Sequence, residues 1–330
     1  MIQACYTLSP DKLSDIYGPE ALARVSRHSQ VKGPVFPGSR WREHASLLRD
    51  TEAIFSGWGA PLMDEEFLDA AKKLKVVFYA AGSVRYFTTP AFWSRGIRLT
   101  SAYAMNAVPV SEYTVAAALF GLKHVWHYAR LTREQRTFIE ERPVVGAYRA
   151  KVGLISYGTI ARMVRDKLRC FDLQVLVYDP FLSAEEAARE GVRLVSLETL
   201  FTESDVVSLH APSLPATRGL LGAEHFGRMK PFATFINTAR GEIVREKELI
   251  DFLRIRPDVQ AVLDVTSPEP PSADNPLFDL PNVMLTPHIA GSLGPECKRM
   301  GDAMVDEFER YLEGRPLSWE LNEQMVARMA

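Results

Sequence analysis

The stretch KVGLISYGTIARMV, residues 151–164, combines a buried-strand pattern, a turn of small residues and a helical pattern. This order is typical of a dinucleotide-binding turn, in which small residues admit a pyrophosphate and the helix N-terminus offers it unpaired amides. The glycine positions of the G-x-G-x-x-G pattern hold Ser156, Gly158 and Ala161. Alanine is an accepted variant in the third position, whereas serine adds a side chain where a tight turn favours glycine. The turn alone is equally typical of an ordinary βα connection.

An acidic residue strengthens the dinucleotide interpretation. Asp179 ends the strand-like QVLVY, and an acid about 20 residues after the turn accepts hydrogen bonds from an adenosine ribose. Its carboxylate would repel a 2′-phosphate, and no Lys or Arg follows before Arg189. The sequence therefore predicts NAD rather than NADP. The alternative is that Asp179 is a turn residue before Pro180.

Strand-like runs alternate with helical patterns on both sides of this turn, as in parallel sheets covered by helices. A long helix is predicted from Ala107 to about Arg130, and an amphipathic helix over residues 294–312 should pack against the rest of the protein. The strand-like runs are residues 2–8, 53–59, 75–82, 97–102, 151–156, 174–180, 192–196, 205–211, 234–239, 260–266 and 282–288. The fold class is therefore α/β, and 330 residues suffice for about two domains.

Composition excludes several classes of protein. Lys and Arg number 39 against 41 Asp and Glu, so no basic field indicates binding to nucleic acid or to anionic membranes. No apolar run reaches membrane-spanning length, and the N-terminal residues lack a signal pattern, which predicts a cytoplasmic protein. Cys5, Cys170 and Cys297 are widely spaced and without a CxxC pattern, so we expect reduced thiols and no metal site.

Four further blocks occur in a fixed order: DVVSLHAPSLPATRGLL (205–221), MKPFATFINTARGEIV (229–244), AVLDVTSPEP (261–270) and TPHIAG (286–291). With the turn and Asp179, they resemble the D-isomer-specific 2-hydroxyacid dehydrogenase family over roughly residues 53–314. The resemblance implies an NAD-dependent oxidoreductase that interconverts a small 2-hydroxy acid and a 2-keto acid. It also implies a homodimer of two Rossmann-like or flavodoxin-like domains with the active site in the cleft between them. The substrate domain would comprise residues 1–103 and 293–330, and the NAD domain residues 104–292.

Three residues are expected to be catalytic. Arg240 follows a strand-like run, and its planar guanidinium can bind a substrate carboxylate and polarise the adjacent carbonyl, unless it is a surface residue paired with Glu242. His288 can exchange one proton near neutral pH, although a lone histidine after a strand is more often structural. Glu269 occupies the position of the family's imidazole partner. Formate dehydrogenases have glutamine there, so Glu269 favours hydroxyacid chemistry.

The resemblance also assigns the ligand contacts. The cofactor-binding residues are Ser156, Tyr157, Gly158, Thr159, Ile160, Asp179, Ala211, Pro212, Thr238, Ala239, Asp264 and Gly291. Asp264 would accept a hydrogen bond from the nicotinamide carboxamide, or it would cap a strand. The substrate would contact the backbone of Gly82 and Ser83 together with Arg240 and His288.

Two departures from the family pattern leave the substrate open. Arg85 stands where the family often has Asp, and Ser101-Ala-Tyr-Ala replaces Asn-x-Pro-Gly. Arg85 would contact a second anionic group of the substrate or form a solvated salt bridge.

Other functions share the same residues. An NAD-sensing corepressor or scaffold protein would keep the fold, and phosphite oxidation would use the same three catalytic residues. His124 and His127 share a helical face but lack a third metal ligand nearby. The family's dimer contact includes the corresponding helix, which implies an interface role for His124, Trp126, His127 and Tyr128.

Overall fold

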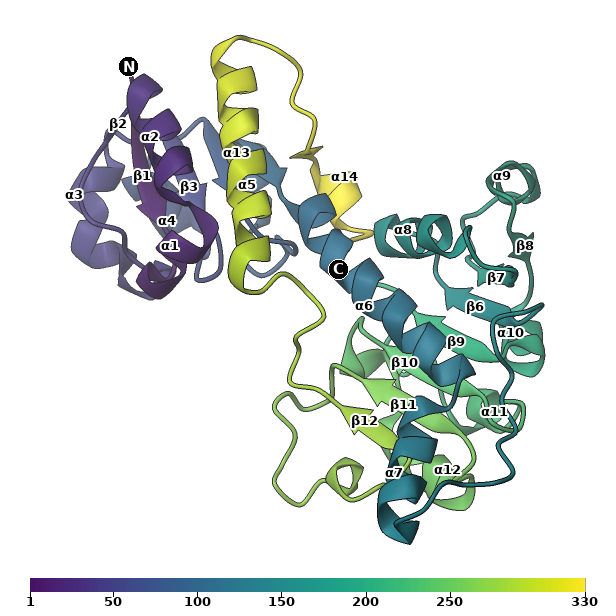
Figure 1. The fold of residues 1–330 in the computed structure, drawn as a ribbon. Coiled ribbons are helices and arrows are strands. Elements are labelled where there is room, and N and C mark those ends of the chain that lie inside the picture. The colour runs from purple at the N-terminus through teal and green to yellow at the C-terminus, as the bar shows by residue number, and fades with distance from the viewer. Residues whose placement is uncertain (330) are drawn as a thin grey trace. The chain divides into compact units, whose positions relative to one another are not determined.

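The computed structural model describes residues 1–329, which form two α/β units (Figure 1). Unit 1 comprises Met1–Ala107 and the residues from Ser292 onward, and unit 2 comprises Val108–Gly291. The first crossing between the units lies inside helix α6 (Tyr103–Leu122), which continues from one unit into the other. Within the described residues, no helix is both long and apolar enough to cross a membrane.

Unit 2 contains a seven-stranded, parallel sheet in the order β12-β11-β10-β9-β6-β7-β8. Its strands are β6 (Lys151–Ile155), β7 (Gln174–Tyr178), β8 (Arg193–Leu194), β9 (Val206–Leu209), β10 (Thr234–Asn237), β11 (Gln260–Leu263) and β12 (Val283–Leu285). The strand order reverses between β6 and β9. Ligands of such sheets bind outside the carboxyl ends of the strands at this reversal, which here lies at the turn after β6.

Helices cover both faces of this sheet. They are α6, α7 (Val125–Gln135), α8 (Thr159–Leu168), α9 (Ala184–Glu190), α10 (Leu197–Glu203), α11 (Ala223–Phe226) and α12 (Glu246–Ile255). Neighbouring side chains of a strand point to opposite faces. In β10, Ile236 packs with residues of α6 and α8, whereas Phe235 packs with residues of α10, α11 and α12. The strand is therefore buried throughout.

The predicted helix from residue 107 to about 130 is interrupted. His124 has a left-handed backbone (φ 50°), which separates α6 from α7. Its ring is buried, stacks on Phe232 with centroids 5.4 Å apart, and lies 3.2 Å from the Pro143 carbonyl oxygen through Nδ1. Burial lowers the pKa of His124, so the ring is neutral at pH 7. These tertiary contacts, which the periodicity could not reveal, turn His124 inward and remove it from the exposed face of α7.

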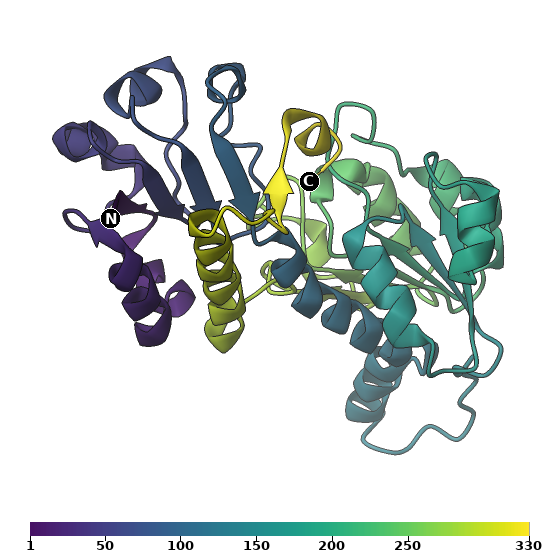
Figure 2. The ribbon, with the colours of Figure 1, turned by 90° about the horizontal axis from the view of Figure 1, so that it is seen from above.

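Unit 1 contains a six-stranded sheet in the order β13-β5-β4-β3-β1-β2, parallel except for β13. Its strands are β1 (Ile2–Thr7), β2 (Ser29–Val31), β3 (Ala53–Ser56), β4 (Val76–Tyr79), β5 (Arg98–Ser101) and β13 (Glu320–Leu321). The sequence analysis missed β2 and β13, because neither of these short strands lies within a longer strand-like run. Figure 2 shows helices on both faces of this sheet. Residues of α1 (Leu13–Ile16), α2 (Pro19–His28) and α13 (Cys297–Leu312) form one core cluster, and residues of α3 (Ala45–Leu48), α4 (Glu65–Ala70), α5 (Pro90–Ser94) and α14 (Glu323–Val326) form the other.

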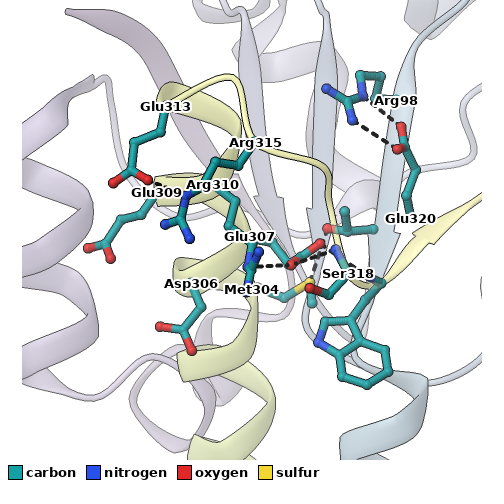
Figure 3. A network of polar contacts seen from close by, with 12 residues as sticks. Arg98, Met304, Asp306, Glu307, Glu309, Arg310, Glu313, Arg315, Ser318 and Glu320 are labelled. Carbon is teal, nitrogen blue, oxygen red and sulfur yellow. Dashed lines mark hydrogen bonds and ion pairs between the residues drawn. The ribbon is translucent and has the colours of Figure 1, made fainter.

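A buried carboxylate holds the segment that follows α13. Glu307 is 1% exposed, and its two oxygens accept the backbone amides of Ser318 and Trp319, each at 3.0 Å (Figure 3). Arg98 of β5 donates to both oxygens of Glu320 at 2.6 and 2.8 Å. These contacts direct the chain back to the sheet, where β13 pairs with β5.

The substitution Glu307→Gln should lower the free energy of unfolding by about 2 kcal/mol, because one buried amide then faces an NH2 group instead of an acceptor. The matched control is Glu313→Gln, because Glu313 is exposed and pairs only with Arg315 among the described residues. We expect its effect to stay below about 0.5 kcal/mol. Urea denaturation followed by circular dichroism measures both, and equal effects would contradict the prediction.

Candidate active site

All the predicted nucleotide and catalytic residues of unit 2 lie just beyond the carboxyl ends of its strands. Residues 156–160 follow β6, Asp179 follows β7, Ala211 and Pro212 follow β9, and Thr238–Arg240 follow β10. Asp264 and Glu269 follow β11, and residues 286–291 follow β12. Because the strands are parallel, these residues share one edge of the sheet.

Asp179 stabilises the turn after β6. Ser156 adopts a left-handed backbone with φ 71°, as the glycine of the pattern would, and its hydroxyl donates to Asp179 Oδ2 at 3.3 Å. The Tyr157 amide donates to the same oxygen at 2.7 Å, and the Phe181 amide donates to Oδ1 at 2.7 Å. The serine thus gains a partner that glycine would lack. Asp179 has no Lys or Arg within ion-pair distance in the described part of the chain.

The same turn presents an open backbone surface. Gly158 is the N-cap of α8, and a Cβ built there would have no atom within 4 Å. Across residues 1–329, the amides of Gly158, Thr159 and Ile160 donate to no acceptor. Unpaired amides at a helix N-terminus suit an anion, so this surface fits a pyrophosphate. The Tyr157 side chain instead is buried and accepts from Arg165 Nε at 2.9 Å, so its predicted cofactor contact is confined to its backbone.

His210, next to the predicted cofactor contacts Ala211 and Pro212, is a buried histidine. Its Nε2 lies 3.0 Å from the Ser208 hydroxyl, and no group in the described residues pairs with Nδ1. Burial lowers the pKa of His210 to about 3. The ring is therefore neutral over the whole range in which a free imidazole titrates.

This burial makes stability depend on pH. In the unfolded chain the imidazole of His210 takes up a proton below about pH 6.5, which the folded state does not allow. The contribution of neutral His210 to the free energy of unfolding is therefore fully present above that pH and decreases as the pH falls toward 3. From pH 7 to pH 5 we expect His210 to remove about 2 kcal/mol from the free energy of unfolding. Urea denaturation at both pH values measures the decrease in the free energy of unfolding. This decrease should be smaller by that amount in His210→Gln than in the wild type, and an equal decrease would contradict the prediction.

A short turn after β10 fixes Arg240. Asn237 accepts the Ala239 amide at 3.0 Å and donates to the Arg240 carbonyl at 3.1 Å. The guanidinium donates to the Ala239 carbonyl at 2.6 Å and has no carboxylate within ion-pair distance among residues 1–329. Glu242 pairs with Arg218 at 3.2 Å, so the alternative of a pair between Arg240 and Glu242 is wrong. Burial lowers the pKa of Arg240, while nearby Glu269 and Glu242 raise it.

The loop that carries Arg240 packs against the loop that carries Glu269. A Cβ built on Gly241 would lie 2.1 Å from the carbonyl carbon of Thr266. Only glycine allows this approach of two backbones. The turn after β10 and the loop after β11 are therefore in direct contact, and Glu269 contributes to the electrostatics of Arg240.

His288 and Glu269 form a close pair. The distance from Nδ1 to Oε1 is 2.5 Å, and the side chains are 46% and 40% exposed. His288 has a left-handed backbone with φ 54°, a conformation that costs a non-glycine residue roughly 1 kcal/mol or more. With Nδ1 occupied by Glu269, Nε2 is the nitrogen left for a substrate.

Hydrogen bonds to Asp264 stabilise the left-handed backbone conformation of His288. Asp264 is 1% exposed, and it accepts the Thr286 hydroxyl at 2.6 Å and the amides of Ile289 and Ala290 at 2.8 Å each. Its carbonyl oxygen accepts the His288 amide at 3.0 Å. These contacts support the strand-capping alternative, and the hydrogen bond to a nicotinamide stays a prediction.

A cavity of about 560 Å³ adjoins the pair. Its apolar walls are formed by Val265, Pro270, Pro271, Phe278, Leu285 and Pro287, and its polar walls by Asp264, Thr266, Glu269, Thr286 and His288. The cavity thus places apolar side chains next to the His288–Glu269 pair.

The predicted substrate loop of unit 1 also has unpaired amides. Those of Gly82, Ser83 and Val84 donate to no acceptor in the part of the chain that the structure describes. The Ser101 hydroxyl lies 2.9 Å from the Ala81 carbonyl and 2.7 Å from the Gly82 carbonyl, so this departure from the family pattern stabilises the loop. Consecutive unpaired amides of this kind can bind an anion.

Arg85, on the same loop, is exposed. It donates to the Met329 carbonyl at 3.4 Å and forms no ion pair among the described residues. The predicted salt bridge is therefore absent from residues 1–329.

Two residues that support the site were not identified from the sequence. Asn237 shapes the Arg240 turn, and Thr286 bonds to Asp264. Both are polar residues at the end of a buried strand, directly before a predicted site residue. That position is a signal that the sequence contains.

Comparison with known proteins places these observations in one family. Residues 115–290 match the family described as "D-isomer specific 2-hydroxyacid dehydrogenase, NAD binding domain". A D-3-phosphoglycerate dehydrogenase of Archaeoglobus fulgidus is 34% identical over 262 residues, which cover 79% of this chain and 49% of that protein. The chain thus spans about half the length of the phosphoglycerate dehydrogenases that it matches. A glycerate dehydrogenase of Methylorubrum extorquens is 30% identical over 312 residues, covering 89% of this chain and 96% of that protein.

Solved structures show the same fold. The TT0316 protein from Thermus thermophilus has a TM-score of 0.77 and 28% identity, covering 97% of this chain and 100% of that one. A phosphoglycerate oxidoreductase from Rhizobium etli has a TM-score of 0.83 at 22% identity, covering 99% and 100% of the two chains. From the matched residues and these relatives, the chain belongs to the D-isomer specific 2-hydroxyacid dehydrogenase family.

Proposed function

We propose that this protein is an NAD-dependent dehydrogenase that interconverts a 2-keto acid and a 2-hydroxy acid. The observation that carries the proposal is the 2.5 Å pair of His288 and Glu269 at the carboxyl edge of the sheet, beside the loop of Arg240, which has no carboxylate partner among the described residues. A histidine, its acidic partner and a free guanidinium are the groups that reduction of a keto acid requires. Family membership supports the same chemistry.

The residues that would hold NAD(H) are those of the turn after β6. The unpaired amides at the start of α8 suit the pyrophosphate, and Asp179 suits the adenosine ribose. When bound, NADH supplies the hydride that reduces the keto carbon. Asp179 favours NAD over NADP, because its carboxylate would repel a 2′-phosphate and no Lys or Arg in residues 1–329 forms an ion pair with it.

The protein's own residues bind the substrate and move its proton. The Arg240 guanidinium binds the carboxylate in a bidentate manner and polarises the neighbouring carbonyl. As the family resemblance implies, the amides of Gly82 and Ser83 would also contact the substrate. In reduction, protonated His288 donates from Nε2 to the carbonyl oxygen while Glu269 stabilises the imidazolium through Nδ1. In oxidation, the neutral ring accepts the hydroxyl proton.

Absorbance at 340 nm tests the proposal. Each reaction contains the purified protein, NADH and one 2-keto acid. The acids tested are glyoxylate, pyruvate, hydroxypyruvate, 4-methyl-2-oxopentanoate, phenylpyruvate and oxaloacetate, and a parallel series uses NADPH. We expect consumption of NADH with at least one acid and a lower rate with NADPH. Saturable NADH binding without consumption across the panel would contradict the proposed enzyme, and a preference for NADPH would contradict the role of Asp179.

The substitution Gly158→Ala tests the cofactor turn. A methyl group there meets no protein atom, so the variant should fold normally, but it would occupy the surface assigned to the pyrophosphate. We expect the Kd for NADH to rise by about 10-fold or more, a loss of at least about 1.4 kcal/mol. Quenching of tryptophan fluorescence measures the Kd. Gly18→Ala serves as the folding control, because Gly18 is also a helix N-cap with a negative φ and a methyl there makes only ordinary contact with the Lys298 side chain at 3.8 Å. An unchanged Kd would place the pyrophosphate elsewhere.

We further propose a homodimer formed through residues 125–149. None of these residues is buried, although they include the exposed Phe138, Val144, Val145 and Tyr148. Apolar side chains without a cover in their own chain favour a partner surface, and a second copy is the partner that the family resemblance implies. Light scattering after size exclusion should give twice the chain mass, and Phe138→Asp should shift the protein toward the monomer.

A further inference from the structure

We propose that Tyr113 is a positioning residue that sets His288 through a hydrogen-bonded relay of Thr286 and Asp264. The inference rests on the proposed function, because it concerns the geometry of the proton-transferring imidazole. Tyr113 itself lies on α6 and belongs to none of the strand-end loops that form the site. Three observations support this role of Tyr113: the direction of the hydrogen bonds, the burial of the Asp264 carboxylate and the position of α6 in the chain.

The direction of the first hydrogen bond follows from proton counting. The Tyr113 hydroxyl lies 3.0 Å from Thr286 Oγ1, and Thr286 Oγ1 lies 2.6 Å from Asp264 Oδ1. The threonine hydroxyl has one proton, and an ionised carboxylate can only accept. Thr286 therefore donates to Asp264, and Tyr113 must donate to Thr286. Burial raises the pKa of Tyr113, so the phenol keeps the proton that this bond requires.

The end of the relay determines the His288 backbone. Asp264 is 1% exposed and accepts the amides of Ile289 and Ala290 at 2.8 Å each. The amide of His288 lies 3.0 Å from the carbonyls of Asp264 and Thr286. These bonds hold His288 at φ 54°, a conformation that the chain would leave if they loosened. The hydroxyl of Tyr113 forms a second hydrogen bond with the Thr286 hydroxyl and so limits the rotation of the threonine side chain.

The location of Tyr113 gives the relay a second consequence. The chain passes between the two units twice, inside α6 after Ala107 and after Gly291. The relay links α6 to residues 286–290, which directly precede the second crossing. On the other side of both crossings, the Ser292 amide donates to Asn106 Oδ1 at 2.9 Å. The bond between Tyr113 and Thr286 therefore links α6 to the loop that carries His288.

The substitution Tyr113→Phe removes only the hydroxyl and keeps the ring that packs between α6 and the sheet. We expect kcat for the best 2-keto acid to fall about 3- to 10-fold, with KM and the Kd for NADH unchanged within about twofold. Tyr103→Phe is the matched control, because Tyr103 lies on the same helix and its hydroxyl has no partner among the described residues. Thr286→Val should lower kcat at least as much as Tyr113→Phe does. Thr286→Ser keeps the hydroxyl and should lower kcat less. Because both act through one relay, the double variant Tyr113→Phe/Thr286→Val should resemble Thr286→Val alone.

A second measurement does not depend on activity. Hydrogen–deuterium exchange of the peptide covering residues 286–291 should be faster in Tyr113→Phe by about fivefold, with unchanged exchange in β6 and β10. The same peptide should be unaffected in Tyr103→Phe. Equal kcat and equal exchange in the two tyrosine variants would overturn the relay, as would a rise in KM and Kd together with faster exchange throughout unit 2. A wild-type protein that consumes no NADH with any keto acid would instead overturn the proposed function, while the exchange experiment would still decide the relay.

Discussion

His288→Ala is expected to lower kcat for reduction of the best 2-keto acid by about 10²- to 10⁴-fold, the usual contribution of a positioned general acid. His288 presents Nε2 for proton transfer because Nδ1 is held 2.5 Å from Glu269. Removal of the ring leaves the keto oxygen without a proton donor. The Kd for NADH should stay within about threefold, because the cofactor contacts lie on other strand ends. Steady-state kinetics and fluorescence titration provide the two values.

Two comparisons make this result specific. His28→Ala removes an exposed histidine at the end of α2 and should leave kcat unchanged. Added imidazole should restore part of the rate of His288→Ala, because free imidazolium can diffuse into the vacated space and donate the proton that His288 donates. A kcat within about threefold of wild type would show that another group transfers the proton.

Arg240→Lys is expected to lower kcat/KM for the 2-keto acid by about 30- to 1,000-fold, because truncating a partner of a desolvated charge pair costs about 2–4 kcal/mol. Lysine keeps the charge but has no planar fork, so it cannot bind a carboxylate in a bidentate manner while polarising the carbonyl. The guanidinium has no carboxylate partner among residues 1–329, so it has no competing ion pair to break before it binds the substrate. Initial rates over a range of keto-acid concentrations give both kinetic constants.

The control for this substitution is Arg254→Lys. Arg254 is a half-exposed arginine on α12 whose one ion pair within residues 1–329 is with Asp251, and its exchange should leave kcat/KM unchanged. If Arg240→Lys retained more than about one third of the wild-type kcat/KM, Arg240 would not bind the substrate carboxylate.

The sequence predicted most of the architecture because the strands of unit 2 are covered on both faces. Continuous apolar runs such as 151–156 and 234–239 are typical of such strands, and the order of the runs indicated a parallel sheet. The strand ends then placed the site residues on one edge. The short strands β2 and β13 were missed because, unlike the equally short β8 and β12, neither lies within a longer strand-like run.

Local pattern could not reveal contacts between segments that are distant in the chain. The break between α6 and α7 depends on the packing of His124 against Phe232, which lies more than a hundred residues later. Likewise, the capping role of Asp264 requires the loop after β12 to fold onto the end of β11. The pair of His288 and Glu269 was predicted from family resemblance, because their spacing alone does not determine a contact.

The most direct measurement is the fate of a labelled hydride. The protein is incubated with the best 2-keto acid and each of the two C4-deuterated stereoisomers of NADH, and the product is analysed by mass spectrometry. The account predicts that one stereoisomer yields a 2-hydroxy acid with a single deuterium at C2, one for each NADH consumed, and that His288→Ala and Arg240→Lys greatly reduce its formation. Bound NADH that transfers no deuterium to any keto acid would contradict it.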